Sequence, residues 1–110
     1  MRLTAHEALE IWRRMLREAV RRDAPDLTAR QLAVLLDVYL GQPPHTVRGL
    51  ASELEIAKPA VTRALDRLCA LDLVRRKTDP EDRRSILVQR TVKGSVFLSE
   101  FAEAVLRGVE

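Results

Sequence analysis

The chain has 110 residues, of which 46% are hydrophobic and 32% are charged, and it contains one cysteine. This length is enough for one domain around one core, and no apolar run approaches the length of a membrane span or of a signal-peptide core. From the length we therefore expect a single compact domain over residues 1–110. One cysteine excludes an internal disulfide, which fits a protein of the reducing cytoplasm.

The positive charge is concentrated in one segment. The net charge is +3, but residues 58–93 contain ten Lys or Arg against five acids. Such a basic segment is typical of a nucleic-acid binder, although a run of charge is more often only a solvated face. The elements that carry this charge decide between the two interpretations.

Two helices are predicted in the first 40 residues. Thr4 and Glu7 form a capping box, and apolar residues then recur at helical spacing to about Arg21. Thr28 and Gln31 form a second capping box at the start of a helix over about residues 28–40, which is apolar nearly all round. We therefore expect the second helix to be the most buried one.

The spacing over residues 46–71 predicts a helix-turn-helix. Thr46 is suited to cap a short helix, Ala51 is small enough for a close crossing, and Pro59 can begin the next helix. The outward residues of this second helix are short or charged and would not block entry into a DNA groove: Lys58, Pro59, Ala60, Thr62, Arg63, Asp66 and Arg67.

A β-hairpin and a last helix complete the predicted fold. Residues 73–78 and 85–90 read as two antiparallel strands joined by the charged tip "DPEDRRS", and Thr91 is placed to cap a helix with an apolar stripe. A helix-turn-helix followed by a hairpin is a winged helix. The expected fold class is therefore mainly α with a small β-hairpin, namely a winged helix-turn-helix (helix-turn-helix 46–71, wing 73–90) flanked by N- and C-terminal helices.

The stretch from Thr46 to Gly94 resembles the DNA-binding half of the MarR family of bacterial transcriptional regulators. Its wing, "DRRSILVQRTVKG", is similar to the family pattern of Asp-x-Arg, a strand and Leu-Thr-x-x-Gly. The resemblance covers about residues 27–94. Arg90 stands where the family usually has leucine, and Glu55 stands at a turn position where glycine is common.

The resemblance implies a sequence-specific regulator of transcription, a repressor, that binds a pseudo-palindromic double-stranded operator. The second helix of the helix-turn-helix would enter the major groove with Thr62 and Arg63 at base edges, while Thr46 and Lys58 hold phosphates. Arg84 would enter the minor groove and Arg83 would contact a phosphate. The predicted DNA-binding set is Thr46, Lys58, Pro59, Ala60, Thr62, Arg63, Arg67, Arg83 and Arg84, and Asp79 and Asp82 are predicted to shape the wing.

Family members usually dimerise through their first helix and two C-terminal helices. Only about 16 residues follow Gly94, so we expect the final helix to be missing. We still expect a homodimer through residues 1–22 and 92–110, although the same side chains could instead close the core of their own domain. The predicted dimerisation residues are Trp12, Met15, Leu16, Phe97, Phe101, Val105 and Val109.

Other functions have less support in the sequence. His6 and His45 are isolated, the latter as an expected solvated turn residue, and no nucleophile elbow, phosphate loop or metal spacing is present. We therefore expect no enzyme, cofactor or metal. A small-molecule inducer is possible from the resemblance but has no support in the residues. The alternatives are a winged helix used for protein contact and a non-specific DNA-binding protein.

Overall fold

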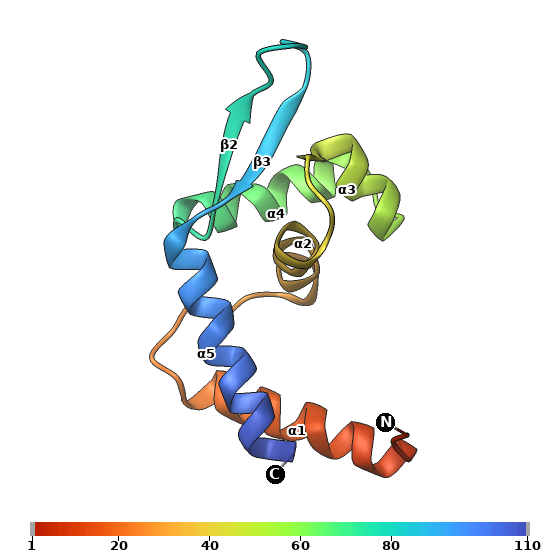
Figure 1. The fold of residues 1–110 in the computed structure, drawn as a ribbon, viewed down its shortest axis with the longest axis vertical. Coiled ribbons are helices and arrows are strands. Elements are labelled where there is room, and N and C mark those ends of the chain that lie inside the picture. The colour runs from red at the N-terminus through yellow and green to blue at the C-terminus, as the bar shows by residue number, and fades with distance from the viewer. Residues whose placement is uncertain (1, 110) are drawn as a thin grey trace. The chain divides into compact units, whose positions relative to one another are not determined.

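The computed structural model describes the backbone of residues 2–109 and the side chains of residues 2–107. Its elements are α1 (Ala5–Arg21), α2 (Ala29–Leu40), β1 (His45–Thr46), α3 (Val47–Leu54), α4 (Lys58–Ala70), β2 (Val74–Thr78), β3 (Ile86–Arg90) and α5 (Val92–Val109) (Figure 1). The order confirms a mainly helical winged-helix fold. It forms two compact units: the winged unit, residues 27–95, and the terminal unit, which lies within residues 1–26 and 96–110.

Local capping signals position the helices where the sequence predicts them. The hydroxyls of Thr4 and Thr28 accept hydrogen bonds from the backbone N–H groups of Glu7 and Gln31, and both reciprocal bonds of each capping box are present. The bonds from Thr4 lower the pKa of Glu7. A hydrogen bond from Arg13 to Glu10, one turn later, lowers the pKa of Glu10 to about 2.

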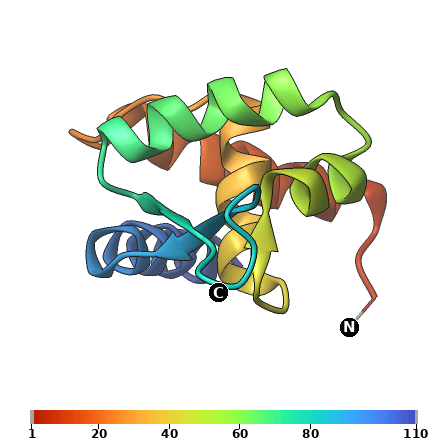
Figure 2. The same cartoon turned by 90° about the horizontal axis from the view of Figure 1, so that it is seen from above.

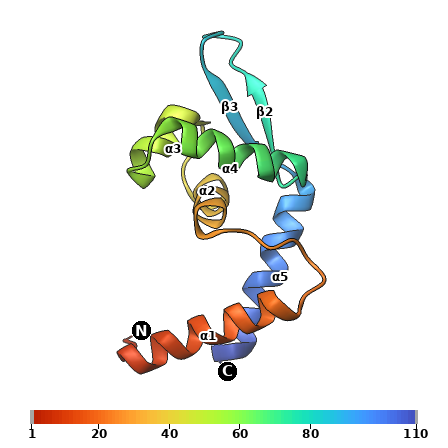
Figure 3. The same ribbon diagram turned by 180° about the vertical axis from the view of Figure 1, so that it is seen from behind.

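The sheet contains one strand more than the two-stranded hairpin that the sequence predicts. β1 pairs with β3 through His45 and Val88 and through Thr46 and Leu87, so the sheet is three-stranded and antiparallel in the order β1-β3-β2. His45 is therefore half-buried in a strand, and the expectation of a solvated turn residue was wrong. The hairpin of β2 and β3 extends past α3 and α4 within the winged unit (Figure 3).

The core of the winged unit lies where α2, α3, α4 and the sheet meet (Figure 2). All of these layers contribute buried apolar side chains, which include Val34, Leu35, Val38, Leu50, Ala51, Val61, Leu65, Leu68, Leu73, Val74 and Val88. Leu36 and Leu40 are 41% and 80% exposed. α2 has three buried residues and α4 has four, so the expectation that α2 would be the most buried helix was wrong. The reason is that α3, α4 and β3 cover only part of its circumference.

A polar junction fixes the start of α5 against α2. The hydroxyl of Tyr39 accepts a hydrogen bond from the Thr91 N–H at 2.9 Å and lies 2.8 Å from the carbonyl oxygen of Leu73. The Thr91 hydroxyl donates to the carbonyl of Asp72 and accepts from the Gly94 N–H. Gly94 is required here, because a Cβ atom would lie 1.9 Å from the Tyr39 hydroxyl oxygen and 2.2 Å from the Leu73 carbonyl oxygen.

Aromatic rings and one arginine form the centre of the terminal unit. The rings of Phe97 and Phe101 pack edge to face with centroids 5.1 Å apart, and the Arg22 guanidinium lies over both. Arg22 also donates to Glu100 at 2.6 Å. Among the described residues, no helix is long and apolar enough to cross a membrane.

Candidate nucleic-acid interface

The turn between α3 and α4 is closed by a left-handed residue. Thr46 caps α3 by accepting a hydrogen bond from the Gly49 N–H at 2.9 Å, as predicted. Glu55 ends α3 with φ 54° and ψ 43°, in the region where a side chain is strained and glycine is not. The N–H of Ile56 then bonds the carbonyl of Ala51, which completes the turn. This closure sets the crossing of α4 over α3.

The buried side of α4 determines which residues face outward. Val61, Ala64, Leu65 and Leu68 are buried and fix the rotation of the helix about its axis. The other side carries the predicted DNA-binding residues of this helix. Lys58, Pro59, Thr62, Arg63 and Arg67 are exposed and Ala60 is half-buried.

Asp66 has a structural partner in the wing. Its carboxylate accepts a hydrogen bond from Arg76 of β2 at 2.8 Å, and this bond raises the pKa of Arg76. The side chains are 60% and 35% exposed, so the pair contributes little to overall stability, about 0 to 1 kcal/mol. Its effect is local: it ties the middle of α4 to the base of the hairpin. The sequence marked both residues as charged but could not pair them.

Acidic side chains shape the tip of the wing. Asp79 accepts a hydrogen bond from the Glu81 N–H at 2.9 Å, and Asp82 accepts one from the Arg84 N–H at 3.1 Å. The Ser85 N–H bonds the carbonyl of Asp82, and the Asp79 N–H bonds the carbonyl of Ser85. The carboxylates therefore hold the backbone of the turn. Arg83 and Arg84 are exposed, and neither guanidinium forms an ion pair with another described residue.

A groove of about 500 Å³ collects part of the predicted set. Thr46 and Lys58 line it from the starts of α3 and α4, and Asp82 and Arg84 line it from the wing tip. Arg48, which is not in the predicted set, lines the same groove. Arg48 lies in the first turn of α3, two residues after the cap. This position is the signal that could have identified it.

Arg63 lies in a different hollow. It shares a space of about 180 Å³ with Ala60 and with Thr28, Arg30 and Gln31 at the start of α2. Arg30 is thus a second exposed basic residue that the sequence analysis missed. The remaining predicted residues, Pro59, Thr62, Arg67 and Arg83, line neither space.

The predicted dimerisation residues divide by exposure. Trp12 and Leu16 are 56% and 47% exposed, and Met15, Phe101 and Val105 are half-buried. Phe97 is only 7% exposed, because Phe101 and the Arg22 guanidinium cover its ring. Phe97 therefore belongs to the core of the terminal unit and offers little surface to a partner, which is the alternative that the sequence left open for these side chains. The side chain of Val109 lies outside the described residues. Across the part of the chain that is described, no three His, Cys, Asp or Glu residues are placed to hold a metal ion.

Comparisons with known proteins place the chain in a family. A family model described as the MarR family matches residues 25–85, more than half of the chain. No curated protein matches the sequence.

Solved structures give the same result. The crystal structure of MarR is 25% identical with a TM-score of 0.66, covering 91% of this chain and 67% of that one. YusO from Bacillus subtilis is 29% identical with a TM-score of 0.68, covering 93% and 67%. The transcriptional repressor CouR, bound to a 23-mer DNA duplex, is 28% identical with a TM-score of 0.71, covering 92% and 68%.

The match of the family model spans α2, the helix-turn-helix, β2 and the wing tip, so it includes the exposed basic residues described above for the winged unit. Regulators of this family bind DNA and are not enzymes. The chain therefore belongs to the MarR family of winged-helix, DNA-binding transcriptional regulators.

Proposed function

We propose that the chain acts as a homodimeric repressor that binds a pseudo-palindromic operator, with α4 in the major groove and the wing in the minor groove of each half-site. The observation that carries this proposal is the groove that joins Thr46, Lys58 and Arg84, because it brings both helix starts and the wing tip onto one surface of the winged unit. Half-site centres in such dimers lie about one helical turn, ~34 to 36 Å, apart.

The roles of the residues follow from their positions. Thr62 and Arg63 project from α4 and would meet base edges, where an arginine can donate two hydrogen bonds to guanine. Lys58, near the start of α4, would hold a phosphate, as would Thr46 at the start of α3. We add Arg48 to the phosphate contacts, because it lines the same groove.

The wing would contribute the remaining contacts. Arg84 has its backbone fixed by Asp82 and its guanidinium exposed, which suits entry into a narrow minor groove of A·T-rich sequence. Arg83 would contact the adjacent phosphate. The repressor assignment is supported by CouR, which is 28% identical and is a transcriptional repressor bound to duplex DNA. A repressor of this kind acts on chromosomal DNA in the cytoplasm.

Selection of bound fragments from a random duplex pool tests the proposal and supplies the operator for the next step. Arg63→Ala should then lose affinity mainly for the selected site and relax the preference at one position. Lys58→Ala should weaken all sequences about equally and lower the slope of log affinity against log salt by about one. Equal losses on selected and random duplexes in both variants would show that α4 contacts phosphates only.

The same experiment separates the alternatives. A non-specific DNA-binding protein would shift duplexes in a salt-dependent manner without enriching any sequence. A winged helix used only for protein contact would give no salt-dependent shift at all. Repression is tested by placing the selected operator between a promoter and a reporter gene, since a repressor lowers and an activator raises expression.

A further inference from the structure

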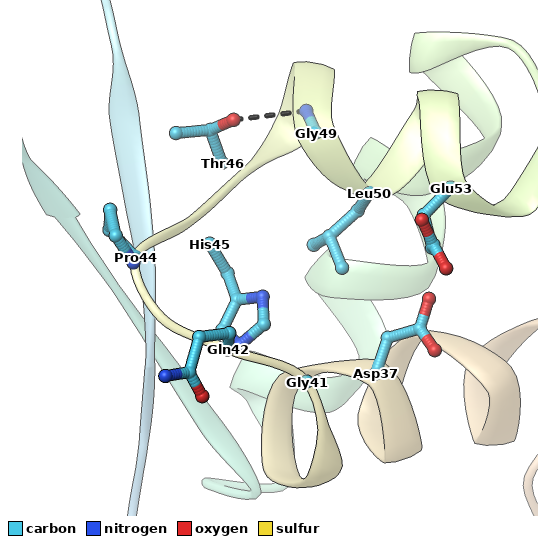
Figure 4. A pocket seen from close by; sticks show the side chains of 9 residues that line it. All are labelled: Asp37, Gly41, Gln42, Pro44, His45, Thr46, Gly49, Leu50 and Glu53. Atoms are coloured by element: carbon cyan, nitrogen blue, oxygen red, sulfur yellow. Dashed lines mark hydrogen bonds between the residues drawn. The ribbon is translucent and has the colours of Figure 1, made fainter.

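A pocket with two acidic side chains in its lining lies beside the surface proposed to bind DNA, on the side of α3 that faces α2. It has a volume of about 370 Å³, within the range of small-molecule sites, and all of its lining residues belong to the winged unit. Asp37 of α2 and Glu53 of α3 point toward one another across it, and His45 of β1 lies beside them (Figure 4).

Two buried atoms in this pocket lack a hydrogen-bond partner among the described residues. They are the Oδ2 atom of Asp37 and the Nε2 atom of His45. A buried polar atom without a hydrogen-bond partner is costly, so such atoms call for an explanation. Gly41 permits the arrangement, because a Cβ atom there would lie 3.0 Å from the Cε1 atom of His45.

The charge of the pocket is opposite to that of the chain. Its lining contains two carboxylates and neither lysine nor arginine, whereas the chain has a net charge of +3. Leu50 supplies an apolar wall beside these acids, and Pro44 lines the opposite end of the pocket. A ligand that satisfies the pocket must therefore donate hydrogen bonds, carry positive charge and have a small apolar body.

We propose that this pocket binds a small organic cation, an amine or amidine, whose N–H groups donate to Asp37 and Glu53 and whose apolar body contacts Leu50. A metal ion fits less well, because no group of three His, Cys, Asp or Glu residues in the described chain has metal-holding geometry. Thr46 lines this pocket and also caps α3, so the ligand lies next to the start of the helix-turn-helix.

Benzamidine is the probe, and benzamide is its neutral control of nearly the same shape. Each compound is titrated into 15N-labelled full-length protein, and the backbone amide signals of Gly41, His45 and Gly49 should shift. The apparent affinity from these shifts should be at least about tenfold higher for benzamidine than for benzamide, which is the scale of one charge-assisted hydrogen bond. Asp37→Asn and Glu53→Gln should each weaken benzamidine about tenfold or more. Glu103→Gln removes the same charge from an exposed position in α5 and should change nothing.

Stability provides an independent measurement. An unpartnered carboxylate that is kept for binding and not for folding should be dispensable, so Asp37→Asn should melt at or above the wild-type temperature. Benzamidine should raise the melting temperature of the wild type but not of Asp37→Asn.

Three results would overturn the proposal. Equal binding of benzamide would indicate an apolar cavity only, and an equal loss in Glu103→Gln would indicate bulk electrostatic attraction. Absence of shifts at the pocket amides up to the solubility limit would indicate a cavity filled by water. None of these measurements uses DNA, so the test stands independently of the proposed operator binding.

Discussion

Glu55 is the residue at which the chain departs from the preferred backbone of an L-amino acid inside the helix-turn-helix. With φ 54° and ψ 43°, it costs on the order of 1 kcal/mol that glycine would avoid. Glu55→Gly should therefore raise the melting temperature by a few degrees, measured by circular dichroism. Ser52→Gly, at an exposed position within α3, is the control and should lower it, since glycine is unfavourable inside a helix.

Arg84 and Asp82 form the most informative pair in the wing, because bulk electrostatics and local geometry predict opposite effects for the acid. Arg84→Ala should lower specific DNA affinity by ~1 to 3 kcal/mol, the scale of one good specific contact, without an appreciable change in melting temperature. Asp82→Ala removes a negative charge near DNA, yet it should also lower affinity, because the hydrogen bond that fixes the Arg84 N–H is lost.

Gel shifts at moderate salt measure both variants, and Glu81→Ala is the control for charge. Glu81 is an exposed acid of the same tip that enters the hydrogen bonds of the turn through its backbone N–H, so removal of its carboxylate should leave affinity unchanged or raise it slightly. Tighter binding by Asp82→Ala would mean that the tip is a solvated turn whose acids only oppose DNA.

At the scale of elements, the sequence predicts what local interactions determine. The capping boxes of Thr4 and Thr28, the cap at Thr46 and the antiparallel hairpin each depend on residues close together in the chain, and each is confirmed. β1 was missed because two residues carry no periodicity, and its only support is the distant pairing with Leu87 and Val88. For the same reason the sequence could not place Arg48 and Arg30 beside Lys58 and Arg63.

The junction of α2, β3 and α5 is an element-level contact that depends on Gly94. Gly94→Ala should destabilise the chain by ~1 to 3 kcal/mol, the usual cost of overpacking, because the new Cβ meets the Tyr39 hydroxyl and the Leu73 carbonyl. Urea unfolding measures the change, and Ser95→Ala, at the next and exposed position, should be nearly neutral.

Tyr39→Phe tests the cause of that effect. Alone it should cost ~1 to 3 kcal/mol, because the Thr91 N–H loses its acceptor. Combined with Gly94→Ala it should cost less than the sum of the two single changes, since the closest clash is with the hydroxyl itself. Strict additivity would show that the backbone contact with Leu73 dominates.

For the whole molecule, the division into two units separates the surface proposed for DNA from the surface proposed for a second copy. The winged unit carries the basic residues proposed to contact DNA, whereas α1 of the terminal unit has no buried residue at all. Leu9, Trp12, Leu16 and Val20 are 61%, 56%, 47% and 80% exposed. Their spacing of three and four residues places them along one stripe of the helix. A single apolar residue on a surface is ordinary, but a continuous stripe of this kind marks an interface.

We therefore expect a homodimer by light scattering at micromolar concentration, and a monomer there would contradict the proposal. Trp12→Gln combined with Leu16→Gln should weaken self-association by roughly 100-fold or more, because burial of each side chain contributes ~1.5 to 3 kcal/mol. Arg17→Gln introduces the same residue about 100° further around α1, at an exposed position, and should leave the dimer intact.

A pseudo-palindromic site is bound more tightly by two linked winged units than by one. The double variant should therefore also bind the selected operator more weakly at equal protein concentration, while circular dichroism shows that it keeps its fold. Equal operator affinity in the dissociated variant would mean that each winged unit recognises its half-site alone, and the dimer would then have no part in recognition.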